Sequence, residues 1–508
     1  MLHSTDSGTA STVLKGTDSV ACSIDPTLNF DHTIDLPAAP PPVFDDEIHT
    51  KRFMEKDPAV MAASKVYLRM YIKGLSTVIF AIFAIFSIYW GSLWRIPAHS
   101  MRGWIIDFDG GDVGLTVVRN LTLAPPHIIK WEVIPPRFFP LGEPEVIEAI
   151  KDNRAWVIIT INTAASSNLQ DAMALPDPSY NGSRAITVYG VEARNENAYR
   201  TLIRPNVQMF LDAIKLDYAT RLVSQLSSGT DTDVLSLMSI SPQTLVNPIS
   251  YTLLNVIPFN QPVASAVVFV GLIYLLILSF FIVMIGFKAR QASGLNRMLR
   301  LKSIIVLRLI SSFLAYFFLS FFYSLLNLAF KLDLTRRFGH SGFFLFWMLS
   351  WIGMLAVGLA LDALITLVGP DYVPYFMILW IITNVAVCIF PIEILPFVYR
   401  YGHVAPFYNI SNSIRSIAFG TKNTLGRNFV VLFCWVLVSC VTLPLIQWYV
   451  RKKEARAAAR RVAVSSGLPQ DPEKHLVLLS RINLPPIQRY VRRKEAEAAG
   501  LALQQHGS

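Results

Sequence analysis

Six long runs of apolar residues constrain this chain more than any other feature of its sequence. Each is long enough to cross a hydrocarbon core of about 30 Å as an α-helix that rises about 1.5 Å per residue. Only 16% of the residues are charged, against about 25% in ordinary globular proteins. We therefore predict a polytopic α-helical membrane protein with six transmembrane helices. The runs lie at residues 75–95, 262–286, 304–329, 342–368, 373–397 and 429–449.

The spacing of these runs predicts one helix, a long insertion and then five helices. Because about 75 residues precede the first run, we interpret that run as a signal anchor and not as a cleavable signal peptide. The first residues are rich in Ser, Thr, Asp and Pro, which is typical of disorder. The predicted parts are a disordered cytosolic arm (1–70), the first transmembrane helix (71–95), an extracytoplasmic α+β domain (96–261), a five-helix membrane domain (262–450) and a basic cytosolic tail (451–508).

Basic residues set the predicted orientation, because they collect on the cytosolic side of membrane proteins. They cluster before the first run, in the loop 287–303 and after the last run, so we predict that both termini are cytosolic. The bias is imperfect, since the predicted outer loops 330–341 and 398–428 hold three and four basic residues. All glycosylation sequons, Asn-x-Ser/Thr, fall on the predicted outer side. Their acceptors are Asn120, Asn181 and Asn409.

The segment 96–261 contains the patterns of both strands and helices. Runs of β-forming residues occur in "GWIID", "AWVIITI" and "AITVYGV", and each predicts a strand. The segment 199–227 has apolar residues at helical spacing, which predicts an amphipathic helix. Its predicted buried side carries Leu211, Ile214, Tyr218, Leu222 and Leu226. A small mixed α+β domain follows from these patterns.

The stretch "GWIIDFDGGDVG" (103–114) resembles the nucleophile loop of a phosphotransferase. In that chemistry Asp107 would attack a phosphoryl group, Asp109 would act as acid or base, and Mg²⁺ would neutralise charge. A lysine and a distal acidic pair are also required, and no Asp-Asp or Asp-x-x-x-Asp pair follows a strand downstream in this segment. We therefore interpret the stretch as the end of a strand and a glycine-rich turn, in which the aspartates bond local amides.

Several stretches in a fixed order carry a resemblance to a known family. After the Asp-x-Asp-Gly strand end, they are "AWVIITINTAASSNLQDA" (155–172), "YGVEARNENAY" (189–199), "VIPFNQPVASAVVFVGLIYLLILSFF" (256–281) and "YGHVAPFYNISNSIRSIAFGTKNTLGRNF" (401–429). The pattern resembles the fungal nitrosoguanidine-resistance family of membrane proteins. That family is similar to bacterial phage-infection proteins and to type-two ABC-exporter permeases. The resemblance covers about residues 70–455.

This resemblance implies a multi-pass plasma-membrane protein linked to resistance to toxic small molecules and to phospholipid distribution. It supplies no catalytic residue. Permeases of this type work with an ATPase, yet the chain has no G-x-x-x-x-G-K-[ST] loop. A motor would therefore be a separate ATPase chain, and analogy suggests a homodimer.

Polar residues inside the apolar runs are candidate functional groups, because burying a charge in lipid costs about 2.5–3.5 kcal/mol on insertion scales. They are Arg308, Asp362, Asn384 and Glu393. Arg308 and Asp362 both lie toward the predicted cytosolic side, so we expect them to pair. Glu393 lies between two prolines near the predicted outer end of its run, too far in depth to pair with Asp362. Either these groups stabilise the bundle, or they line a polar path or proton relay.

Two further segments have open interpretations. The loop 398–428 carries repeated aromatic and basic residues, which predict either a re-entrant helix closing the bundle or a contact with lipid headgroups. In the tail, "LPLIQWYVRKKEARAAA" (443–459) recurs as "LPPIQRYVRRKEAEAAG" (484–500), with 12 identities in 17 positions. Both copies are cationic and favour helix. The second is either a solvated helix or a contact with the inner leaflet.

The sequence predicts a transport role rather than catalysis. The nine histidines are scattered singly, so we expect no metal site and no cofactor. The basic tail 451–508 beside the membrane suggests an anionic lipid surface sooner than nucleic acid. The leading hypothesis is a permease-like protein that moves, or assists the movement of, toxic or amphipathic small molecules or lipids. The alternative is a non-transporting regulator of lipid asymmetry or of a partner membrane protein. A phosphatase within 96–261 ranks third.

Overall fold

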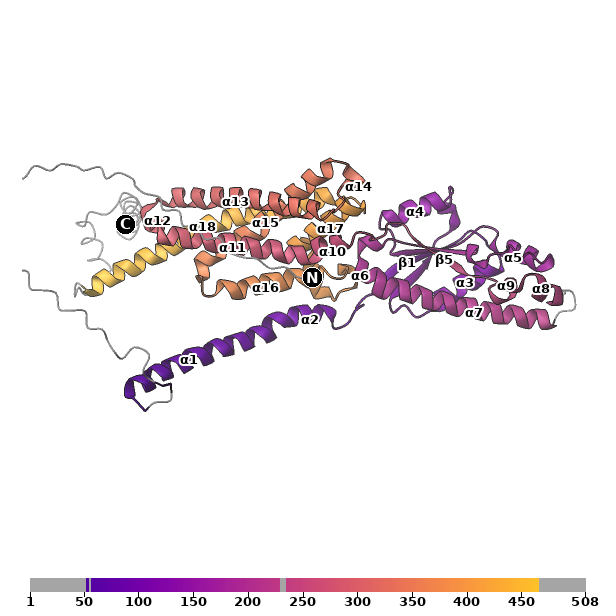
Figure 1. Cartoon of the computed structure of the whole chain (residues 1–508), viewed down its shortest axis with the longest axis horizontal. Coiled ribbons are helices and arrows are strands. Elements are labelled where there is room, and N and C mark those ends of the chain that lie inside the picture. Colours follow the sequence, from indigo (N-terminus) through magenta and orange to yellow (C-terminus); the bar gives the residue numbers. More distant parts are fainter. Residues whose placement is uncertain (1–51, 54–55, 229–233, 466–508) are drawn as a thin grey trace, which may run out of the picture. The chain divides into compact units, whose positions relative to one another are not determined.

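The computed structural model describes residues 52–53, 56–228 and 234–465 (Figure 1). The chain divides into two compact units, Met1–Gly74 and Leu75–Ser508. Within the described residues, five helices are long and apolar enough to cross a membrane. They confirm a polytopic helical membrane protein. They are Pro58–Leu93 (α1 Pro58–Ala81, η1 Ile82–Phe86, α2 Ser87–Leu93), Pro262–Ala292 (α10 Pro262–Ser265, η6 Ala266–Val270, α11 Gly271–Ala292), α13 (Leu301–Ala329), α15 (Ser341–Val368) and the first part of α18 (Leu425–Ser465).

The first and last of these helices extend beyond the predicted spans. Helix α1 begins at Pro58, where the carboxylate of Asp57 accepts the N–H of Ala59 at 2.8 Å. Residues 58–70 are therefore helical, and the prediction that they belong to a disordered arm is wrong. Helix α18 continues to Ser465, so the first copy of the tail repeat is helical, as predicted. The second copy (484–500) and residues 1–51 lie outside the described residues.

The predicted fifth span, 373–397, is not one continuous helix. Helix α16 covers only Val373–Val385, and thirteen residues rise about 20 Å, less than the hydrocarbon core. The chain then turns and continues in two short 3₁₀-helices, η7 (Ile392–Ile394) and η8 (Phe397–Val404). Pro391 and Pro396 precede these helices and have no N–H to donate to a helical ladder. The prediction of six full-length helical spans is therefore wrong at this helix.

A five-stranded sheet forms the centre of the segment between α2 and α10. Its order is β2-β1-β3-β4-β5; β1 pairs in parallel with β2 and β3, β4 pairs in parallel with β5, and only β3 and β4 are antiparallel. We call residues 96–261 the sheet domain. The strands are β1 (Met101–Asp107), β2 (Ile129–Val133), β3 (Val157–Ile161), β4 (Ile186–Gly190) and β5 (Tyr251–Asn255).

Helices cover both faces of this sheet (Figure 1). The core on one face contains Ile105 of β1 with residues of α3, α5 and α7. On the other face, Ile106 and Ile158 pack with α4, in a cluster that continues into the helical bundle. The helices of the domain are α3 (Asp112–Leu123), η2 (Pro136–Phe138), α4 (Glu143–Lys151), α5 (Ala165–Ala174), η3 (Gly182–Arg184), η4 (Glu192–Arg194), α6 (Glu196–Ala198), η5 (Tyr199–Ile203), α7 (Arg204–Ser228), α8 (Val234–Ile240) and α9 (Pro242–Val246).

Helix α15 lies at the centre of the bundle and is buried on most of its surface. It contacts α11, α13 and α18, and also α17 (Pro406–Phe419), in which nearly every side chain is buried. The loop 398–428 thus contains a helix that packs into the bundle, which favours the structural interpretation of this segment. Two short helices, α12 (Leu295–Met298) and α14 (Thr335–Phe338), connect the long ones.

Close packing at the start of α15 generates a test of the bundle. A Cβ added at Gly342 would lie 1.9 Å from the carbonyl oxygen of Leu334, whereas a Cβ at Gly426 of α18 would meet nothing within 4 Å. We expect Gly342→Ala to destabilise the protein by about 1–3 kcal/mol, because a backbone atom cannot move aside cheaply. Gly426→Ala should leave stability unchanged or slightly raised. Thermal unfolding in detergent measures both; equal midpoints for the two variants would contradict this packing.

Candidate functional site

Arg308 and Asp362 lie together inside the bundle, as the sequence analysis predicted. Nε of Arg308 donates to Oδ2 of Asp362 at 3.0 Å, and its Nη2 lies 2.9 Å from Oδ1. Nη1 of Arg308 also donates to Oε1 of Gln447 at 2.5 Å. Both charged side chains are buried. Because an unpaired charge would be costly there, the pair explains how α13 and α15 tolerate ionised groups.

Asn384 has a structural role at the start of α17. Its Oδ1 accepts the N–H of Phe407 at 3.2 Å, and its Nδ2 donates to the carbonyl oxygen of Trp380 at 2.9 Å. The first N–H groups of a helix have no partner within the helix. Asn384 therefore satisfies one of these groups for a buried helix.

Glu393 does not lie within a long apolar helix, where the sequence analysis placed it. It lies in η7 beyond the end of α16, and its side chain is 58% exposed. Its Oε2 accepts the indole N–H of Trp156 at 2.5 Å and lies 3.5 Å from Nη2 of Arg194. Both partners belong to the sheet domain. Glu393 therefore connects the bundle to that domain.

The aspartates of "DFDGGD" form a turn, in agreement with the structural interpretation. Oδ1 of Asp107 accepts the N–H groups of Asp109 and Gly110, both at 3.0 Å. Asp109 accepts the N–H and the hydroxyl of Ser166 and the N–H of Gly111. Burial raises the pKa of Asp109, but these hydrogen bonds outweigh it and the net pKa is lowered. In the described residues, no three His, Cys, Asp or Glu side chains could hold a metal ion.

The three glycosylation candidates differ in their surroundings. Asn181 is exposed and Asn120 is half-buried, so both remain predicted acceptors. Asn409 is fully buried in α17, and its Nδ2 donates to the carbonyl oxygens of His403 and Ala405. A glycan cannot be attached to this side chain in the folded protein. The prediction of a glycan at Asn409 is therefore wrong.

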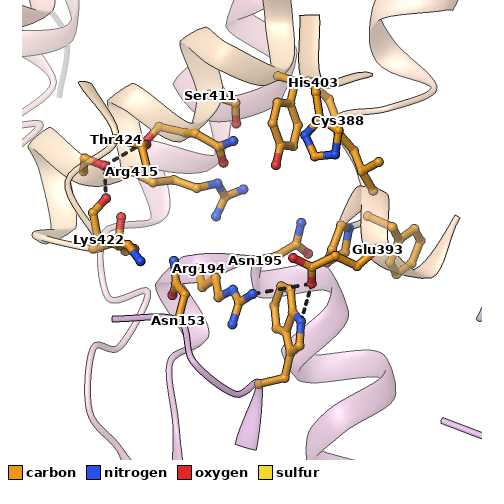
Figure 2. Close-up of a pocket in the computed structure, with 18 of the residues that line it drawn as sticks. Asn153, Arg194, Asn195, Cys388, Glu393, His403, Ser411, Arg415, Lys422 and Thr424 are labelled. Carbon is orange, nitrogen blue, oxygen red and sulfur yellow. Dashed lines mark hydrogen bonds and ion pairs between the residues drawn. The ribbon is translucent and has the colours of Figure 1, made fainter. Parts of the chain in front are cut away.

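A polar cavity of about 290 Å³ lies where the sheet domain meets the bundle. We call it the junction pocket. In Figure 2, Arg194, Asn195 and Asn153 of the sheet domain face His403, Glu393, Arg415 and Ser411 of the bundle side across this cavity. The lining residues are Asn153, Trp156, Arg194, Asn195, Cys388, Phe390, Pro391, Ile392, Glu393, His403, Tyr408, Ser411, Asn412, Arg415, Ser416, Thr421, Lys422, Thr424 and Arg427.

Two of the four cations in this pocket are held by carboxylates. The guanidinium of Arg194 stacks on the ring of Trp156, with Cζ 3.3 Å from the ring centroid, and pairs with Glu393. Burial lowers the pKa of Arg194 to about 10, against the opposing effect of Glu393, so it remains charged at neutral pH. Arg415 pairs with Glu196 at 2.5 Å and donates to the carbonyl oxygen of Ala193.

The other two cations have no carboxylate partner within the described part of the chain. Lys422 donates to the carbonyl oxygen of Asp152 at 2.9 Å, and Arg427 has no hydrogen bond or ion pair there. Both side chains are exposed. Among the lining residues that the structure describes, Glu393 is the one carboxylate; with Glu196, which pairs with Arg415 from outside the lining, two carboxylates stand against four cations and leave an excess of two positive charges. Such a site favours an anion.

The end of α17 places the cations on the bundle side. Gly420 adopts a positive φ of 73° and ends the helix. The hydroxyl of Ser416 then donates to the carbonyl oxygen of Lys422 at 2.8 Å, which holds the connecting loop beside the helix. Helix α18 begins at Leu425 and presents Arg427 in its first turn.

His403 lies in the wall of the junction pocket and also lines a neighbouring cavity of about 370 Å³ with His99, Glu393 and Arg400. Burial lowers the pKa of His403, and Arg427 and Arg400 lower it further, while Glu393 acts in the opposite direction. The imidazole is therefore predominantly neutral at neutral pH.

Sequence reasoning found only part of this site. It singled out Glu393, for another role, and it identified the segment 398–428, to which Arg415 and Lys422 belong, as one that could contact headgroups. It missed Trp156, Arg194 and Arg427. Trp156 and Arg194 lie some 200 residues before Glu393 and in a different domain, so no local pattern connects them with it.

A family model described as "Protein of unknown function (DUF3533)" matches residues 75–441. The chain belongs to this family. The match contains every residue that lines the junction pocket. The chain is also 24% identical, over 399 residues, to an uncharacterized endoplasmic reticulum membrane protein of Saccharomyces cerevisiae (strain ATCC 204508 / S288c), covering 73% of this chain and 78% of the yeast protein. No solved structure matches significantly.

Membership in the DUF3533 family supports the resemblance at the level of a membrane protein family of unknown function. The finer identification, with nitrosoguanidine resistance and with exporter permeases, remains a prediction. The same holds for the plasma membrane as location and for the orientation of the termini.

Removal of the Glu393 side chain tests the contact between the two domains. We expect Glu393→Ala to lower the stability by about 1–3 kcal/mol, because it leaves the buried indole N–H of Trp156 without an acceptor. Glu393→Gln retains an acceptor and should cost less than about 1 kcal/mol. Glu132→Ala, which breaks an exposed pair with Arg102, is the control and should cost about 0–1 kcal/mol. Thermal unfolding midpoints rank the stabilities of the three variants against wild type. A Glu393→Ala midpoint equal to that of wild type would contradict the contact.

Proposed function

We propose that the protein binds anionic amphipathic molecules at the membrane surface and assists their movement across the bilayer. The observation that supports this proposal is the junction pocket, where four cations line a polar cavity and only two of them pair with carboxylates, Glu393 and Glu196. Lys422 and Arg427 are available to an incoming anion, because no carboxylate occupies them in the described structure. Phosphate and carboxylate headgroups are the natural ligands of such donors.

An apolar stripe on α18 continues from the pocket along the helix. Residues 427, 430, 434, 437 and 441 share one side of an α-helix. After Arg427, this side carries exposed apolar residues: Val430, Cys434, Leu437 and Val441. A molecule with an anionic head and an apolar tail would pair with Arg427 through its head and cover the apolar stripe of α18 with its tail. This arrangement favours lipids and amphipathic toxins over small hydrophilic anions.

The chain contains no phosphate-binding loop of its own. In this proposal, movement is either down a gradient or driven by a separate ATPase chain, and the homodimer suggested by analogy remains part of the hypothesis. The role is binding and transport rather than catalysis.

Two membranes are compatible with this role. A resistance function requires the plasma membrane, whereas the name of the yeast relative points to the endoplasmic reticulum. In either membrane, the predicted orientation places the sheet domain on the side away from the cytosol. The proposed chemistry is the same in both.

A second function is favoured by the tight contacts around the pocket. Arg415–Glu196 and Arg194–Glu393 join the sheet domain to the bundle through the walls of the cavity. A bound headgroup would change these contacts directly. In this second function the protein would bind lipid as a regulator and would transport nothing across the membrane.

Lipid movement in proteoliposomes separates these functions. We expect the purified full chain to accelerate the exchange of a fluorescent phosphatidylglycerol between leaflets. Arg427→Gln should weaken the binding of the headgroup about tenfold or more, since hydrogen bonds to charged groups contribute about 1.5–3 kcal/mol. Arg119→Gln, an exposed arginine of α3, should behave as wild type.

The outcomes of this experiment are distinct. Headgroup binding without movement would reject transport and support the regulator. Unchanged headgroup binding in Arg427→Gln would overturn the assignment of the pocket as the anion site.

The lowered pKa of His403 generates a pH prediction. A phosphodiester such as glycerophosphoglycerol carries one negative charge throughout the range from about pH 8 to about pH 5, so only the protein titrates. Protonation of His403 occurs below its ordinary value of about 6.5 and adds positive charge to the pocket wall. The affinity of the pocket for glycerophosphoglycerol should therefore be constant above about pH 6.5 and should rise as the pH falls below that value. The rise should disappear in His403→Gln; a rise of equal size in that variant would contradict the role of His403.

A further inference from the structure

A second group of charged residues lies at the other end of the bundle, about 30 Å from the junction pocket along α18. Arg427 lines the pocket and Gln447 belongs to the second group; they are twenty residues apart on this helix, which corresponds to about 30 Å. We call Arg290, Arg308, Asp362 and Gln447 the inner arginine site. They come from α11, α13, α15 and α18.

The inner arginine site contains one more positive charge than negative charge. Oδ1 of Asp362 lies 2.9 Å from Nη2 of Arg308 and 3.3 Å from Nη2 of Arg290. One carboxylate thus serves two guanidinium groups, and Gln447 contributes only a neutral oxygen. All three charged side chains are nine-tenths or more buried. A buried excess charge is costly unless a counter-charge is present.

Of the two arginines, Arg290 is the one with N–H donors that have no partner in the described structure. Arg308 uses all three of its nitrogens, on Asp362 and Gln447. Arg290 donates from Nη2 to Asp362, and the described structure gives its other two nitrogens no partner. Nη1 of Arg290 lies close against Gly286 of the same helix, because a Cβ added there would be only 3.2 Å from it. A glycine therefore lets one of the two spare nitrogens, Nη1, approach its own helix, and a larger side chain at this position would press on it.

The surroundings of Arg290 add further positive charge. The segment 287–303 holds five basic residues and no acidic residue. Arg451 of α18 donates to the carbonyl oxygens of Asn296 and Leu299, each at 3.0 Å, and so holds this segment beside α18. This is the end of the bundle that the basic residues predict to be cytosolic. Basic pockets between helices at this depth are suited to anionic headgroups.

We propose that the inner arginine site binds the phosphate of an anionic phospholipid of the inner leaflet. The phosphate accepts hydrogen bonds from the spare nitrogens of Arg290 and supplies the missing negative charge, and the acyl chains remain in the bilayer around the bundle. This site is separate from the junction pocket and does not depend on transport.

Native mass spectrometry of the full-length protein, titrated with phosphatidylserine or phosphatidylcholine, tests the proposal. Wild type should retain phosphatidylserine in preference to phosphatidylcholine. Arg290→Gln should reduce this preference about thirtyfold, because it removes a largely desolvated charged contact. Lys288→Gln, the control, removes an exposed charge two residues away and should reduce it no more than about fivefold.

A second variant covers the case in which Arg290→Gln fails to fold. Gly286→Leu keeps every charge and fills the space beside Nη1, so the preference for phosphatidylserine should also be lost. The proposal is overturned if wild type shows no preference, if Gly286→Leu retains it, or if Arg290→Gln and Lys288→Gln lose it equally. Displacement of the lipid by millimolar inorganic phosphate would identify a soluble anion as the ligand and would likewise overturn the lipid assignment.

Discussion

A charged group that leaves water needs a partner, and this requirement holds the sheet domain against the helical bundle. Arg415, buried in α17, pairs with Glu196 of the sheet domain, and Arg194 of that domain pairs with Glu393 beyond α16. Hydrogen bonds from side chains to the backbone join the same two parts: Asn195 and Asn197 both donate to the carbonyl oxygen of Ile389. The pairs fix the walls of the junction pocket. The pocket is thus a consequence of how the two parts are joined.

The distribution of charge follows the two surfaces of a membrane. Between the junction pocket and the inner arginine site, α15 is packed with apolar and small residues. Both sites contain more cations than carboxylates, and each lies near one end of α18. The excess at each end is of the sign that phospholipid headgroups can neutralise. Neither site requires the other, so a lipid that stabilises the inner end and an amphipath bound at the outer end can act independently.

The sequence predicts those features that depend on local patterns. Apolar runs predicted the long helices, and the continuous β-forming run 157–161 predicted a strand that is buried throughout. Strand β2 was missed although its five residues, IKWEV, alternate between apolar and polar; the run is short, and only Ile129 is buried. The fifth span was overestimated because hydropathy does not detect where α16 ends before Pro391. Arg308 and Asp362 could be paired because their predicted depths in the membrane agree. Arg290, in contrast, lies in the basic segment after the second apolar run, and the sequence gives no sign that it differs from an ordinary cytosolic arginine. Its burial beside Asp362 depends on the packing of α11 against α15, which no local pattern contains.

The central claim is that an anionic headgroup occupies the junction pocket between the sheet domain and the bundle. Cryo-electron microscopy of the full chain in nanodiscs containing phosphatidylglycerol tests it most directly. The account predicts headgroup density between Arg427 and Arg194, with the Arg415–Glu196 and Arg194–Glu393 pairs in place. A map that shows these pairs around a cavity without headgroup density, or a sheet domain detached from the bundle, would contradict it.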